Sequence, residues 1–248
     1  MTDATAFYID GGWVEPEERH RLDVIDPSTE EACATISLGG QRDTDAAVTA
    51  ARRAFASFAK SSKADRLDLL AAILDRYKAR SQEIAEAISL EMGAPIDLAM
   101  SSQMPAGSYH LKSFIRALEG LELEGPLNGP DKPGRIHLEP VGVCALITPW
   151  NWPMNQVTLK VGAAIAAGCT MVLKPSEIAP LSSMVFAEVM HEAGVPAGVF
   201  NLVNGDGAGV GSQLSGHSGV DMVSFTGSTR AGRAITKAGA ETIKRVSL

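Results

Sequence analysis

The spacing of hydrophobic and polar residues changes at Pro140, and the pattern that follows is the most regular in the chain. Short apolar runs bounded by turn residues alternate with stretches in which apolar positions recur every three or four residues. The first kind is typical of buried strands and the second of helices. Strands are expected near residues 141–148, 170–173, 199–203, 221–226 and 243–248, and helices near 154–167, 180–193, 208–215 and 229–240. This alternation predicts an α/β fold with a parallel sheet and right-handed crossovers, which is a Rossmann-like arrangement.

The chain before residue 120 shows two other patterns. Residues 1–40 contain two pairs of short apolar segments around turn sequences at 10–12 and 26–29, and this predicts two hairpins. From Asp43 to about residue 119 the spacing is helical. Asp43 or Thr44 is the expected cap of the first helix.

Residues 120–140 are rich in glycine and proline and contain two short alternating segments. This composition predicts an exposed two-stranded arm or a linker. The chain is therefore expected to have three parts: hairpins and helices over residues 1–119, an arm over 120–140, and the Rossmann-like part over 141–248.

Composition excludes several classes of protein. The net charge is -7, and the basic residues are scattered, so a nucleic-acid-binding surface is not expected. No apolar run reaches membrane-spanning length, and the N-terminus has no secretory pattern. The three cysteines, Cys33, Cys144 and Cys169, show no CxxC spacing, which favours a reduced cytoplasmic protein. The five histidines form no HxxxH pair, so no catalytic metal is predicted.

The loop Thr148-Pro149-Trp150-Asn151-Trp152-Pro153 follows the first predicted strand of the regular region. Open α/β sheets bind ligands where loops leave the carboxyl ends of their strands. Asn151 is the one neutral amide between two prolines, and its N–H groups can donate to a developing negative oxygen. The simpler alternative is an asparagine that only hydrogen-bonds within its own loop.

Lys174 and Glu177 lie just past the next predicted strand, separated by Pro175 and Ser176. Taken alone, they are as well explained by a solvated ion pair in a turn as by a binding site.

Two glycine-containing turns leave later strands. Phe225-Thr226-Gly227-Ser228 closes a strand and opens a helix, so the residues around Gly227 can present donors to a phosphate. The run from Gly205 to Gly211 leaves the preceding strand, and a flexible turn explains it equally well. Neither turn has the GxGxxG spacing.

Three of these segments together resemble motifs of the aldehyde dehydrogenase family. PWNWP at 149–153 is similar to the family's PWNFP, and VLKPSE at 172–177 and SFTGSTRAG at 224–232 resemble its two cofactor-binding motifs, in the expected order. Weaker similarity in IDGGW, DPSTEE and EMGAP extends the resemblance over essentially the whole chain.

The resemblance implies NAD-linked oxidation of an aldehyde to a carboxylic acid in a cofactor-binding domain. It implies that Asn151 is an oxyanion donor, that Trp150 lines the nicotinamide pocket, and that Lys174 and Glu177 hold the adenosine ribose. A carboxylate at the ribose favours NAD over NADP, because it repels a 2′-phosphate. The full set of expected cofactor-binding residues is Thr148, Pro149, Trp150, Asn151, Lys174, Ser176, Glu177, Gly205, Gly209, Phe225, Thr226, Gly227, Ser228, Ala231 and Gly232.

Members of this family are longer, and the resemblance places their nucleophilic cysteine and general-base glutamate beyond Leu248. Cys144 lies in an apolar strand, where a thiol is inert, so we expect negligible turnover from the chain alone. Three interpretations stay open: half of an aldehyde dehydrogenase, one chain of a split enzyme completed by a catalytic chain, or a non-catalytic dinucleotide-binding scaffold. The expected partners are an aldehyde substrate in the complete enzyme and either further copies, joined through the arm, or the missing catalytic chain.

Overall fold

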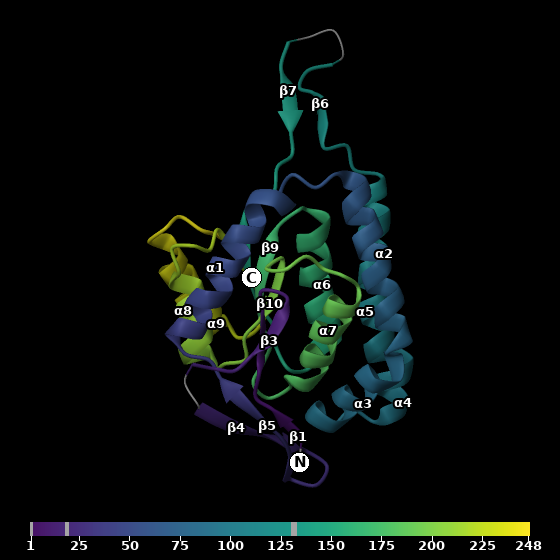
Figure 1. Ribbon diagram of the computed structural model, residues 1–248, viewed down its shortest axis with the longest axis vertical. Coiled ribbons are helices and arrows are strands. Elements are labelled where there is room, and N and C mark those ends of the chain that lie inside the picture. The colour runs from purple at the N-terminus through teal and green to yellow at the C-terminus, as the bar shows by residue number, and fades with distance from the viewer. Residues whose placement is uncertain (1, 18–19, 130–132) are drawn as a thin grey trace.

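The computed structural model describes residues 2–17, 20–129 and 133–248. Residues 1 and 18–19 of the predicted N-terminal part, and residues 130–132 of the predicted arm, lie outside the described residues. Figure 1 shows a central sheet between helices, with the arm at one end and a small three-stranded sheet at the other.

The five strands predicted after Pro140 form the parallel part of a seven-stranded sheet with the order β12-β11-β8-β9-β10-β2-β3. They are β8 (Val143–Ile147), β9 (Thr170–Lys174), β10 (Phe200–Leu202), β11 (Met222–Phe225) and β12 (Arg245–Ser247). All four pairings among them are parallel. The predicted Rossmann-like fold is confirmed.

The first predicted hairpin belongs to this same sheet. It consists of β2 (Phe7–Ile9) and β3 (Gly12–Val14), and Tyr8 of β2 pairs antiparallel with Leu202 of β10. Asp10 and Gly11 both have positive φ, which is the geometry that a tight two-residue hairpin turn requires. The N-terminal and Rossmann-like parts therefore share one sheet.

The second predicted hairpin, β4 (His20–Asp26) and β5 (Glu31–Leu38), forms the small sheet. A strand that the sequence pattern did not predict, β1 (Thr2–Ala4), pairs parallel with β5 and completes it.

The helical pattern between residues 43 and 119 corresponds to five α-helices and one π-helical turn. The first, α1 (Gln41–Phe58), is capped by Gly40, so the prediction of Asp43 or Thr44 as the cap was wrong. Asp43 instead lies in the first turn, where its carboxylate accepts the Gly40 N–H at 2.8 Å. The others are α2 (Lys63–Ala79), α3 (Ser81–Met92), α4 (Ile96–Leu98), the π turn η1 (Ala99–Gln103) and α5 (Met104–Glu119).

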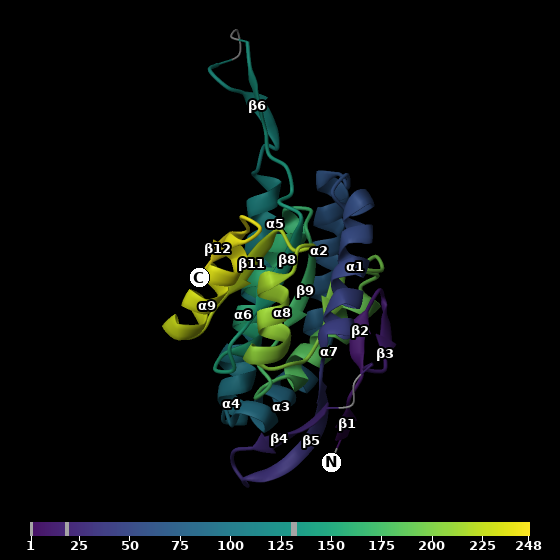
Figure 2. The ribbon, with the colours of Figure 1, turned by 90° about the vertical axis from the view of Figure 1, so that its left-hand side faces the viewer.

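Helices cover both faces of the main sheet (Figure 2). Besides α1, α2 and α5, they are α6 (Pro153–Ala166), α7 (Leu181–Glu192), the π turn η2 (Gly207–Gly211), α8 (Ser212–Gly216) and α9 (Thr229–Ala240). Alternate strand residues enter two hydrophobic clusters. Cys144 and Leu146 pack with α2, α5, α6 and α7, whereas Ala145 and Ile147 pack with α1, α8 and α9.

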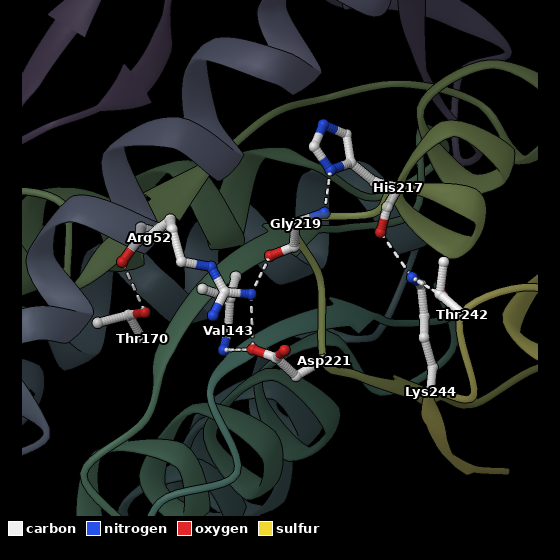
Figure 3. A network of polar contacts seen from close by, with 9 residues as sticks. Arg52, Val143, Thr170, His217, Gly219, Asp221, Thr242 and Lys244 are labelled. Carbon is white, nitrogen blue, oxygen red and sulfur yellow. Dashed lines mark hydrogen bonds and ion pairs between the residues drawn. The ribbon is translucent and has the colours of Figure 1, made fainter.

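The amino ends of β8 and β11 are joined through Asp221. Its carboxylate accepts the Val143 N–H at 2.7 Å and Nη2 of Arg52, which reaches in from α1, also at 2.7 Å (Figure 3). Gly142 has a φ of 129°, and a Cβ there would lie 1.8 Å from Asp221 Oδ2. Only glycine fits at this position.

The predicted arm is a two-stranded antiparallel ribbon of β6 (Glu124–Pro126) and β7 (Arg135–His137). It projects from the body (Figure 1), and an ion pair of 2.6 Å joins Arg135 to Glu124 across it. Within the described part of the chain, none of the helices has both the length and the apolar character needed to cross a bilayer.

Candidate functional site

Four of the loops that carry the predicted site residues leave the same edge of the main sheet. Ile147 at the end of β8 is in register with Lys174 of β9 and with Phe225 of β11. The chain runs from β8 to β9 and β10 on one side, and then returns to place β11 on the other side of β8. The strand order thus reverses between β8 and β11, and in open α/β sheets this point opens the crevice in which ligands bind.

The loop after β8 crosses this crevice. Thr148 is buried and its N–H donates to the Lys174 carbonyl at 3.2 Å, which fixes the start of the loop against β9. Trp150 and Asn151 are exposed. Trp152 is the cap of α6, and Pro153 occupies the first helical position, where its missing N–H costs no hydrogen bond. The Asn151 amide is therefore presented at the crevice on a loop held at both ends.

Lys174 is the buried cation of this edge. Its Nζ donates to Glu177 Oε2 at 3.1 Å and to the Gly205 carbonyl at 2.5 Å. Burial lowers the pKa of Lys174, and the neighbouring Glu177 carboxylate opposes that effect. Glu177 is itself half-buried, so the pair is held in place rather than solvated.

Ser176 stabilises the turn between Lys174 and α7. Ser176 is buried, and its Oγ accepts the Ile178 N–H at 3.3 Å. This contact orders the turn that carries Glu177.

The loop after β10 is closed by Asp206, which the sequence pattern did not single out. Its carboxylate accepts the Gly209 N–H at 2.5 Å. A Cβ on Gly205 would lie 2.3 Å from Val210, and one on Gly209 would lie 2.8 Å from Asp206 Oδ1. Tight packing within the loop thus explains both glycines without a ligand.

A cavity of about 850 Å³ runs along α9 from its start to Ala240. Ser228 caps the helix, with its Oγ accepting the Ala231 N–H at 3.3 Å. A Cβ on Gly227 would lie 2.4 Å from the Phe225 ring, so the strand can enter the helix only through glycine here. The predicted residues that line the cavity are Phe225, Thr226, Gly227, Ser228 and Gly232.

The same cavity is largely apolar, but it also has polar side chains that the sequence analysis missed. Thr229, Arg233, Thr236 and Lys237 line it from one face of α9. Their three- and four-residue spacing was available in the sequence as a signal. The α9 N-terminus lies at one end of the cavity, Arg233 lines it one turn further along the helix, and Lys237 lines it from the last turn of α9. The helix N-terminus and Arg233 suit that end of the cavity to an anionic group.

The structure brings the predicted residues together in three adjacent groups on one edge: the Asn151 loop, the Lys174–Glu177–Gly205 contact, and the α9 cavity. Among the residues that the structure describes, no three histidine, cysteine, aspartate or glutamate side chains gather as metal ligands.

Comparison with known proteins gives this edge its context. The sequence profile of the aldehyde dehydrogenase family matches residues 13–248. The chain belongs to the aldehyde dehydrogenase family.

Curated relatives of this aldehyde dehydrogenase chain are enzymes of the same family. It is 51% identical over 249 residues to a 3-succinoylsemialdehyde-pyridine dehydrogenase of Pseudomonas, and 42% identical over 248 residues to a putative aldehyde dehydrogenase of Staphylococcus haemolyticus. Each match covers all of this chain and 51% of the relative. The chain thus spans about half the length of the curated relatives it matches.

Solved structures of the family agree closely with its fold. An aldehyde dehydrogenase of Bartonella henselae is 54% identical, with a TM-score of 0.98 over 99% of this chain and 52% of its own. A mutant of aldehyde dehydrogenase C of Pseudomonas syringae, complexed with NAD+ and octanal, is 46% identical, with a TM-score of 0.94 over 98% of this chain and 49% of its own.

Proposed function

We propose that this chain is the NAD-binding half of an aldehyde dehydrogenase that oxidises an aldehyde to a carboxylic acid. The observation that carries the proposal is the buried Lys174, held against Glu177 and Gly205 at the edge where the strand order reverses. NAD+ in the related Pseudomonas syringae structure supports the choice of cofactor.

In this proposal Lys174 donates to the ribose hydroxyls of the adenosine and Glu177 accepts from them. The turn at Gly227 and Ser228 presents donors to the pyrophosphate, and Arg233 and Lys237 add positive charge to the same cavity. Trp150 lines the nicotinamide side of the crevice. The remaining predicted residues shape the backbone that the cofactor crosses.

NAD supplies the hydride acceptor when it is bound. Asn151 supplies the electrostatic part of the reaction, because its amide donates to the oxygen that becomes negative when a thiolate attacks the aldehyde. One such preorganised donor lowers the barrier by about 3 kcal/mol.

The chain's own thiols do not fit the role of nucleophile. Cys144 and Cys169 are buried, and both pack in the cluster beneath α6 rather than at the Asn151 loop. Cys33 lies in the small sheet, where its thiol donates to the Val24 carbonyl at 3.3 Å. We therefore propose that turnover requires a cysteine and a glutamate from outside these 248 residues, and that the purified chain produces negligible NADH from aldehydes. Robust turnover would contradict this and return Cys144 or Cys169 to consideration.

Titration of the purified chain with NAD in a calorimeter tests the cofactor site directly. Lys174→Met keeps the volume of the buried side chain but removes its donors, and we expect about tenfold weaker binding or more. Lys78→Met, on the exposed side of α2, is the matched control and should bind as the parent does. A parent chain that does not bind NAD overturns the proposed function, and unchanged binding by Lys174→Met overturns the ribose placement alone.

The choice of NAD over NADP is attributed to the Glu177 carboxylate, which faces the ribose in this proposal. Glu177→Gln keeps the shape and removes the charge, so the ratio of the NADP to the NAD dissociation constant should fall about tenfold. Equal dissociation constants for the two cofactors in the parent chain would remove the preference.

A further inference from the structure

A groove runs along α3, at the end of the molecule that carries the small sheet (Figure 1). It consists of two adjoining cavities of about 770 Å³ and 450 Å³, which share Glu86 and Leu90 as lining residues. The larger cavity is completed by α7, by the small sheet and by the edge strand β3. None of the residues expected to bind the cofactor lines either cavity, so the groove is separate from the crevice at Asn151.

The helix α3 forms one wall of the groove over most of its length. Its lining residues recur every three or four positions and are Glu83, Glu86, Ala87, Leu90, Gly93 and Ala94. This spacing defines one face of a helix, and at 1.5 Å per residue it extends over about 15 Å. A different face of α3 packs in the core, through Ile84, Ala85 and Ile88. The helix therefore has a second face that the body of the protein does not cover completely.

The floor of the groove is apolar. Its lining from α3 and α7 includes Ala87, Leu90, Leu181, Met184 and Val185. Leu90 is 39% exposed, and it lies where the two cavities meet. Trp13 lines the larger cavity and Ile96 the smaller one, and these side chains are 40% and 45% exposed. Apolar side chains that gather in an open groove with a polar rim are typical of a protein-binding surface.

The rim of the groove is acidic. Among the described residues that line the two cavities, the charged ones are Glu15, Asp26, Glu83, Glu86 and Glu188. Arg80, just before α3, pairs with Glu83 at 2.7 Å and also with Glu188. The ion pairs of the described chain leave the other three carboxylates without a cation. The rim therefore keeps a negative charge, to which a basic partner is complementary.

We propose that this groove binds a basic amphipathic helix of a partner protein. The apolar face of that helix would lie on α3 and α7, and its lysine or arginine side chains would reach the acidic rim. A helix fits this site because side-chain ridges of one helix pack between those of another, and about three turns match the open face of α3. The proposal does not depend on the proposed function.

The test is binding of a synthetic peptide to the purified chain, measured by fluorescence anisotropy. The probe is a fluorescein-labelled peptide of about 14 leucine and lysine residues, with leucine at helical spacing. At physiological ionic strength it should bind at least about tenfold more tightly than a scrambled peptide of the same composition, and than a peptide with glutamate in place of lysine. No binding of the probe, or equal binding of the three peptides, overturns the proposal.

A substitution at Leu90 tests whether the probe lies in the groove. Leu90→Lys places a positive charge where the two cavities meet, and we expect about tenfold weaker binding or more. Leu121→Lys is the matched control, because Leu121 is 40% exposed but lines neither cavity, and it should bind as the parent does. Thermal unfolding checks that both variants are folded. Equal weakening by the two substitutions would mean attraction to the whole surface and would refute the proposed site.

A charge reversal at Glu86 tests the role of the rim. Glu86→Lys should weaken binding of the lysine peptide and strengthen binding of the glutamate peptide, since Glu86 lines both cavities. An unchanged ratio of the two affinities contradicts this role. Sedimentation of the parent and of Leu90→Lys tests the alternative occupant: self-association that is lost in Leu90→Lys would assign the groove to a second copy of the chain and overturn the proposal.

Discussion

Glu91 shows how much one residue can depend on partners that are distant in the sequence. It is a fully buried carboxylate on α3, and it accepts the Leu181 N–H, the Ser182 N–H at 3.2 Å and the Ser182 hydroxyl at 2.5 Å at the start of α7. Burial raises its pKa to about 7, although these hydrogen bonds oppose the effect. The sequence shows a glutamate near a helix end, but not that another helix begins against it.

The raised pKa of Glu91 makes a prediction about stability and pH. Folding favours the protonated form of Glu91. The stability that this group contributes to the folded state is therefore complete at a pH below its ordinary pKa of about 4.5, and it is lost as the pH rises through the folded-state pKa of about 7. Glu91→Gln has no group that titrates at this position. It should therefore remove up to about 3 kcal/mol from the change in unfolding free energy between low and high pH.

Urea unfolding at about pH 5 and about pH 8 measures the effect of Glu91→Gln. Glu86→Gln is the matched control, because Glu86 lies on the same helix but is exposed. The same change of unfolding free energy with pH in the parent and in Glu91→Gln would contradict the prediction.

At the scale of elements, the parts fixed by local pattern could be predicted. The strands and helices after Pro140 follow from periodicity and turn residues, and their observed bounds lie close to the expected ones. The pairing of β2 with β10 could not be predicted, since nothing near Tyr8 indicates which distant strand it joins. The same distinction holds for the site: turn residues were found by their motifs, whereas Arg233 and Lys237 point into the cavity only because α9 presents that face.

The junction before β8 leads to a second prediction. Gly142→Ala places a methyl group 1.8 Å from the Asp221 carboxylate at a φ of 129°. The carboxylate must then leave Val143 and Arg52, and we expect a loss of about 3 kcal/mol or more.

Gly216→Ala is the control for Gly142→Ala, because a Cβ at Gly216 meets no atom of the described chain within 4 Å. Denaturant unfolding of both variants gives the comparison. Equal stability of the two variants would show that the Asp221 contact does not hold the two strands.

At the scale of the whole molecule, the arm exposes apolar side chains outside the body. Leu127, Ile136 and Leu138 are exposed on it, and a two-stranded ribbon of three-residue strands has little stability of its own. We propose that it packs on another copy of the chain.

Charge on the arm should weaken that association. Ile136→Lys combined with Leu138→Lys is expected to lower the sedimenting mass at a given concentration. The melting temperature should stay that of the parent at dilutions where the parent is monomeric, since both side chains are exposed on the arm. Glu122→Lys, an exposed position at the base of the arm, controls for added charge. An unchanged mass distribution in the double variant would exclude the arm as the contact.

The antiparallel pairing of Tyr8 with Leu202 sets an order of events during synthesis. At about 5–20 residues per second, the ribosome releases β2 roughly 10–40 s before β10 exists. Through that interval the β2–β3 hairpin exposes the backbone groups that β10 will later satisfy. Translation speed between these segments is therefore a variable that controls how long the nascent protein is open to wrong pairings.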